Sequence, residues 1–95
     1  MKGADLSGCD LRGANLSVSD LTGANLEGAN CKGADLEGAC FVAANLKNAD
    51  FSDCLLVAAR FVDENGDQGA AIDGLNLQGA SGLLGSQEVY LEQEG

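Results

Sequence analysis

The sequence predicts an all-β solenoid, in which short extended segments are joined by regular bends. The first observation is a period of five, because residues 4–63 read without a gap as twelve units of the type ANLEG, seen at residues 24–28. The second observation is that a small residue and a large apolar residue alternate two positions apart within each unit, as they do in a strand. A period of five suits neither a continuous helix nor a continuous strand, so each unit must be a short extended piece followed by a bend.

The large apolar residue at the centre of each unit is predicted to point into a narrow interior. Six of the twelve units end in Gly, which accepts the positive φ that many tight turns need. The residue two places before each centre is always small, because the interior has room for one large and one small side chain per side. The predicted core ladder consists of Leu6, Leu11, Leu16, Leu21, Leu26, Cys31, Leu36, Phe41, Leu46, Phe51, Leu56 and Phe61.

The repeated pattern A-(D/N)-L-x-G resembles that of the pentapeptide-repeat family. This resemblance implies a right-handed quadrilateral parallel β-helix with four units per coil and with the Ala and Leu positions pointing inward. Residues twenty apart would then stack, so that Phe61 would lie on Phe41. We therefore expect about three regular coils, an irregular fourth coil and a C-terminal cap or tail.

The regular pattern divides the chain into four segments. We expect residues 1–63 to form the regular β-helix, 64–69 a corner loop that replaces one side, 70–82 degenerate repeats, and 83–95 a C-terminal cap or tail. The Asn-Gly pair in the second segment is a strong turn signal. The last segment could form at least one helical turn or be disordered.

The degenerate repeats are expected to add an incomplete coil. Ile72 and Leu77 would point inward and stack on Phe51 and Leu56. The segment before them, which begins at Asp63, resembles the opening of a calcium loop, but it lacks the Gly and the Glu that such a loop needs at its sixth and twelfth places. We therefore expect no metal site there.

The sequence offers no catalytic, cofactor-binding or metal-binding site. It contains no His, no phosphate loop, no nucleophile motif and no CxxC pair, so we expect no enzymatic activity and no cofactor. Cys9, Cys31 and Cys54 fall on inward positions, and we expect free thiols in a reducing compartment rather than disulfides. Cys40 falls on an outward position and is either a modifiable thiol or an incidental surface residue.

The outward positions of two sides become apolar late in the repeat. The candidate interaction patch consists of Val42, Leu55, Val57 and Val62. An apolar patch on a protein surface is usually either covered or used. The chain's own tail could cover this patch, or it could be the interface for a partner.

The charge and the ends of the chain limit its partners and its location. A net charge of −10 disfavours binding to nucleic acid or to an anionic membrane. The sequence has neither an apolar run long enough for a membrane span nor a signal segment, so we expect a cytoplasmic protein. The repeat begins midway through a unit, so the chain is either part of something longer or has a coil end that another subunit covers.

The sequence favours a non-enzymatic protein-interaction or structural module. Its protein partner is not specified by these residues, and the chain could form a homo-oligomer through the uncapped coil end or the tail. Two alternatives stay open. Some members of the family that this chain resembles mimic DNA and bind type II topoisomerases, and the chain could also be a structural segment of a longer multidomain protein.

Overall fold

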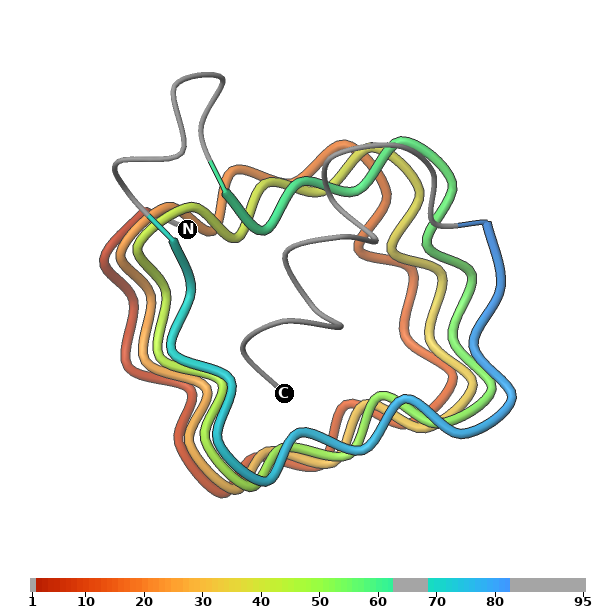
Figure 1. Cartoon of the computed structure of the whole chain (residues 1–95), viewed down its shortest axis with the longest axis horizontal. Coiled ribbons are helices and arrows are strands. Elements are labelled where there is room, and N and C mark those ends of the chain that lie inside the picture. The colour runs from red at the N-terminus through yellow and green to blue at the C-terminus, as the bar shows by residue number, and fades with distance from the viewer. Residues whose placement is uncertain (1, 63–68, 83–95) are drawn as a thin grey trace.

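The chain winds into stacked four-sided rings, as the computed structural model shows for residues 2–62 and 69–82 (Figure 1). Neighbouring rings pair in parallel through isolated bridges between residues twenty apart, for example between Asp5 and Asn25 and between Asn25 and Asn45. Within these described residues the rings contain no helix and no strand longer than a single bridge. No helix in this part of the chain is therefore long and apolar enough to cross a membrane.

The sides of the rings, apart from the one that ends at Val62, end in a tight turn whose second central residue has a positive φ. In the first such turn, the backbone N–H of Cys9 donates to the carbonyl oxygen of Leu6 at 3.1 Å, and Gly8 between them has a φ of 67°. This is the geometry of a type II turn, which favours Gly at its second central position. Five turns keep a positive φ at this position without Gly, at Val18, Ala43, Asn48, Asp53 and Ala58.

The Asp or Asn that precedes most of the centre residues has a structural role that the sequence interpretation missed. The side-chain oxygen of Asn25 accepts a hydrogen bond from the backbone N–H of Glu27 at 3.1 Å. Such a bond to the residue two places on fixes the start of a turn, and Asp and Asn have the side-chain length for it. Oxygens of the same kind accept at Asp5, Asp10, Asn15, Asp20, Asn30, Asp35, Asn45, Asp50 and Asn76.

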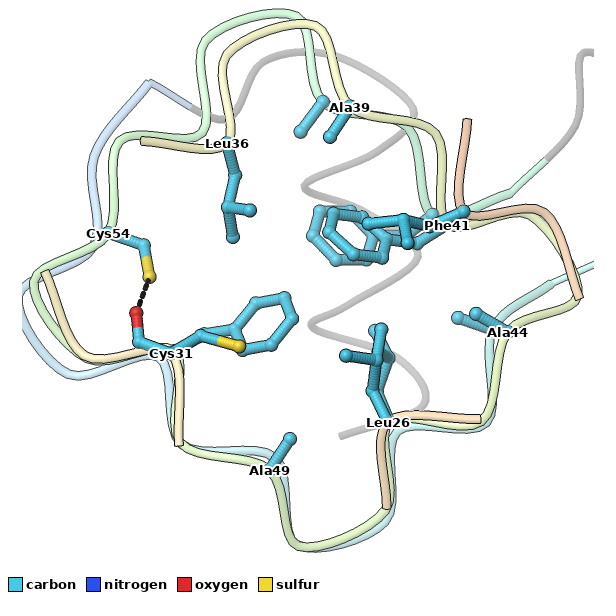
Figure 2. Packing of buried hydrophobic residues seen from close by; sticks show 14 of the residues in the cluster. Leu26, Cys31, Leu36, Ala39, Phe41, Ala44, Ala49 and Cys54 are labelled. Atoms are coloured by element: carbon cyan, nitrogen blue, oxygen red, sulfur yellow. Dashed lines mark hydrogen bonds between the residues drawn. The ribbon is translucent and has the colours of Figure 1, made fainter. Parts of the chain in front are cut away.

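The centre residues stack in four columns, which we use to name the sides. The first side carries Leu6, Leu26, Leu46 and Ile72; the second, Leu11, Cys31, Phe51 and Leu77; the third, Leu16, Leu36, Leu56 and Gly82; the fourth, Leu21, Phe41 and Phe61. The side chains of Leu26, Leu36 and Phe41 point into the shared interior (Figure 2).

The predicted core ladder lies inside the coil. From Leu21 to Phe61 its members are at most 1% exposed. Leu6, Leu11 and Leu16 pack against this core but are only half-buried, because no described residue stacks on their outer side. The core ladder is therefore most deeply buried from Leu21 onward.

Three aromatic rings fill the C-terminal half of the interior. Phe61 stacks on Phe41 with ring centroids 5.2 Å apart and an interplanar angle of 14°, as the twenty-residue spacing predicts. Phe51 reaches the same group from the opposite side, with its ring tilted by 58° and 5.3 Å from Phe41. Tilted and stacked aromatic pairs at these separations are favourable beyond the area they bury.

The register changes by six residues before the last ring. Asn45 pairs with Ala71, twenty-six residues later rather than twenty. Ile72 therefore lies over Leu46, and the prediction that it stacks on Phe51 is wrong by one side. Leu77 is displaced in the same way and lies over Phe51 rather than Leu56.

The pairing of Val62 with Gly69 explains this change. These two residues form an antiparallel bridge, and the N–H of Ala70 donates to the carbonyl oxygen of Phe61 at 2.8 Å. Since Asn45 pairs with Ala71, the first side of the last ring follows the fourth side of the ring before it, and no side is missing between the described residues of the two. The predicted corner loop, apart from Gly69, and the predicted C-terminal cap or tail lie outside the described residues.

Candidate interaction surface

The third side of the coil carries the large apolar side chains that the described surface exposes. It consists of residues 14–18, 34–38, 54–58 and 80–82. Val18 is 80% exposed, Val57 40% and Leu55 38%. Leu55 stands in the middle of this side, where its backbone bridges to Asp35 in the ring before it. A cluster of this kind on one wall is a candidate interface.

Gly38 stands between the two exposed valines in the stack of rings. The N–H of Val18 donates to the carbonyl oxygen of Glu37 at 2.7 Å. The N–H of Gly38 donates to the carbonyl oxygen of Val57 at 2.8 Å. A Cβ added to Gly38 would lie 3.6 Å from Cγ2 of Val18. The missing side chain therefore opens space beside Val18 at the surface.

Val18 holds an unfavourable backbone conformation. Its φ is 60°, in a turn position that has Gly38 in the next ring and Ala58 in the one after. A β-branched residue at positive φ is an outlier, and such outliers gather at functional sites. Sequence reasoning missed Val18, although a signal was present, because its unit ends in Val where most of the early units end in Gly.

The charges of the third side are all acidic among the described residues. Asp35 and Glu37 are its charged side chains, and Oδ1 of Asp35 accepts a hydrogen bond from the N–H of Glu37 at 3.1 Å. The other sides also carry bases: Lys47 on the first side, Arg12 and Lys32 on the second, and Arg60 on the fourth. The third side therefore combines apolar and acidic groups.

The structure divides the predicted patch and corrects one of its members. Val62 is only 4% exposed, which contradicts the expectation that it faces outward. The reason is that its backbone leaves the regular turn to pair with Gly69. Val42 is half-buried in the turn that ends the fourth side, and Arg60 stands on that side between it and Val57. Leu55 and Val57 thus lie together, whereas Val42 is separate.

The cysteines line the interior and one outer wall. All four are free thiols, and the thiol of Cys54 donates to the carbonyl oxygen of Cys31 at 2.8 Å (Figure 2). Burial raises the pKa of Cys31 to about 12 and also raises the pKa of Cys54. Cys40 is half-buried on the fourth side, with its Sγ 3.3 Å from the hydroxyl of Thr22.

The second side carries a polar depression of about 490 Å³. Asp50 lines this depression, and hydrogen bonds from the hydroxyl of Ser52, and to a lesser extent from its N–H, lower the pKa of this carboxyl. The described residues contain no group of three side chains able to hold a metal ion. The depression is lined by Lys32, Asp50, Ser52, Asp53, Asn76, Gln78 and Gly79.

Among the solved structures similar to this chain are a pentapeptide repeat protein and a trypsin-treated variant of a resistance protein. The chain is 38% identical to alr5209, a pentapeptide repeat protein from Nostoc Pcc 7120, over 82% of this chain and 56% of that one, with a TM-score of 0.62. It is 27% identical to QnrB1, a plasmid-mediated fluoroquinolone resistance protein, over 96% of this chain and 39% of that one, with a TM-score of 0.66. The chain thus spans little more than half of the first relative and less than half of the second.

No curated protein sequence matches the chain significantly. A family model, that of pentapeptide repeats, matches residues 1–38 and 19–53 with eight copies. These matches, the period of five and the four-sided rings together show that the chain belongs to the pentapeptide-repeat family.

Proposed function

We propose that the chain is a non-enzymatic protein-interaction module that presents one wall of its coil to another protein. The scaffold is a right-handed quadrilateral β-helix with three regular coils and an incomplete fourth. The observation that carries this proposal is the gathering of Val18, Leu55 and Val57 on the third side. Stacked repeats of this kind hold such a wall in a fixed shape, which lowers the entropic cost of binding.

The chemistry of the described titratable groups supports a role without catalysis. Hydrogen bonds within the turns lower the pKa values of Asp5, Asp10, Asp20 and Asp50, which makes these carboxylates poor proton carriers at neutral pH. Burial raises the pKa of the Cys31 thiol, which makes it a poor nucleophile. The free thiols suit a reducing compartment, so we place the module in the cytoplasm.

Site-specific photo-crosslinking in cells that express the full chain tests the proposal. A benzophenone side chain in place of Leu55, on the third side, is expected to give a protein adduct of defined mass. The same group in place of Lys47, an exposed residue on the first side, is the matched control and is expected to give none. Adducts from both positions, or from neither, would contradict the proposal.

Binding to a type II topoisomerase is a second candidate function, because QnrB1 is a fluoroquinolone resistance protein. Two features weigh against DNA mimicry in this chain. The coil is shortest along its own axis, with extents of 31 × 26 × 24 Å (Figure 1), and its walls carry Arg12, Lys32, Lys47 and Arg60 among their acids. We expect a gyrase supercoiling assay with a fluoroquinolone to be unaffected by the chain at micromolar concentration, and protection of the enzyme would favour this second function.

A further inference from the structure

We propose that the third side binds a partner segment that combines apolar and basic side chains. This proposal rests on the interaction function above and names the chemistry of the partner. The apolar groups of the wall and its acidic groups stand directly beside one another in consecutive rings. A segment must therefore satisfy both kinds of group to fit it.

The exposed valines beside Gly38 are a place for an apolar side chain of the partner. Val18 and Val57 lie on either side of Gly38 and are exposed. Cγ2 of Val18 would be in van der Waals contact with a Cβ at Gly38, so a partner group seated there would touch it. An apolar group that packs on these exposed valines removes apolar surface from water, and buried apolar anchors dominate the energy of many interfaces.

The acidic residues of the third side determine which charge a bound segment should carry. Asp35 pairs through its backbone with Leu55, and Glu37 precedes Val57 by the twenty residues of one ring. Each exposed apolar residue of the third ring thus has a carboxylate in the ring before it. This side has no base among its described residues, so it attracts a basic segment and repels nucleic acid or an anionic membrane.

The conformation of Val18 supports the use of this wall. Gly would adopt a φ of 60° without a Cβ penalty, and the chain has Gly at the equivalent place in the next ring. The valine therefore adds an exposed apolar side chain at a cost to the fold. This is what is expected where a side chain serves binding rather than stability.

Two short synthetic peptides test the proposed chemistry, one alternating Leu and Lys and the other alternating Leu and Glu. Fluorescence anisotropy with the full chain is expected to show binding of the Leu/Lys peptide and none of the Leu/Glu peptide. Amide chemical shifts are expected to move at Val18, Gly38 and Val57. The double substitution Val18→Ser with Val57→Ser is expected to weaken binding by at least about tenfold, since two anchors lose their apolar surface.

A pair of matched charge variants separates this wall from general attraction to an acidic protein. Asp35→Asn with Glu37→Gln is expected to weaken binding by roughly twofold to tenfold. Asp5→Asn with Glu27→Gln makes the same change in charge on the first side and is expected to leave the affinity unchanged. Asn at positions 35 and 5 keeps the side-chain oxygen that accepts within the turn, so both variants are expected to fold.

Two results would overturn the proposed chemistry. These are binding of the Leu/Glu peptide as tightly as the Leu/Lys peptide, and equal losses from the first-side and third-side charge variants. Neither result would contradict the proposed interaction function. That proposal is contradicted only if cross-linking from position 55 and from the control position 47 gives the same result. The two proposals can therefore fail separately.

Discussion

The side-chain oxygen of Asn48 lies over Gly74, in the place that a Cβ on Gly74 would occupy. Asn48 stands in the turn position that most units give to Gly, with a φ of 59°. Asp53 has the same relationship to Gly79 in the next turn. A larger turn residue in one ring is thus accommodated by a Gly in the ring above it, so these positions are coupled between rings.

Replacing Gly74 by Ala is expected to cost more stability than the same change at Gly28. The two glycines share one column and nearly the same φ, 74° and 69°. Nothing lies within 4 Å of a Cβ at Gly28. The substitution Gly28→Ala is therefore expected to lower the free energy of unfolding by about 1 kcal/mol, because Ala must adopt a left-handed backbone conformation. Gly74→Ala also displaces the Asn48 side chain, so we expect a loss of about 2–3 kcal/mol in urea denaturation.

The substitution Asn48→Gly is the control for this coupling. In the Gly74→Ala background it removes the displaced side chain, and it is expected to recover most of the difference between the two Ala variants. Equal losses at Gly28 and Gly74, or no recovery from Asn48→Gly, would contradict the coupling.

The period of five predicts which residue faces which way, but not how far each side chain reaches. It correctly predicts that Phe61 stacks on Phe41, because both lie in an unbroken run of units. It cannot predict that Phe51 crosses the interior to the same pair, because the reach of a side chain across the coil is not set by the period.

The interaction surface could be predicted only in part, for a similar reason. Leu55 and Val57 lie in regular units and are exposed, whereas Val62 lies at the insertion, where the local pairing with Gly69 overrides the repeat. The sequence predicts Ile72 one side away from its observed place over Leu46. The reason is that the repeat pattern does not indicate how many sides of the coil lie between Phe61 and Ile72. Val18 was missed because its unit fits the pattern at its centre and departs from it only at the turn.

Replacing Val18 by Gly is expected to stabilise the fold by about 0.5–1 kcal/mol, because a β-branched residue then no longer holds a positive φ. The matched control is Val57→Gly on the same wall. Val57 does not have a positive φ, so this change is expected to destabilise the chain by about 0.5–1 kcal/mol. Thermal melting of the two variants measures the difference, and a lower melting temperature for Val18→Gly would show that its backbone is not strained.

Asp10 is expected to make the fold sensitive to acid. Nε and Nη2 of Arg12 donate to its two carboxylate oxygens at 2.9 and 2.8 Å, and this pairing, with the N–H of Arg12, lowers the pKa of Asp10 from 3.8 to about 2. Because the folded state favours the ionised form, its contribution to stability is complete above pH 3.8 and is lost as the pH falls toward about 2.

An NMR titration of the side-chain carboxyls measures this effect. The midpoint for Asp10 is expected at about 2, and Arg12→Gln is expected to move it upward while the backbone N–H keeps it below 3.8. Asp10→Asn keeps an acceptor oxygen that does not titrate, so this variant is expected to lose less stability between pH 4 and pH 2 than the wild type. A wild-type midpoint at 3.8 would mean that the pairing with Arg12 does not persist in solution.

Alkylation of the native protein is expected to distinguish the buried thiols from the half-buried ones. The thiolate is the reactive form, and burial raises the pKa of Cys31 to about 12 and also raises the pKa of Cys54. Iodoacetamide at mildly alkaline pH is therefore expected to modify Cys9 and Cys40 and to spare the other two, as read by mass spectrometry of the digested protein. All four are expected to react in guanidinium chloride, which serves as the control. Fast modification of Cys31 in the native protein would place its side chain outside the coil. The assignment of the second-side centre residues to the interior would then be wrong.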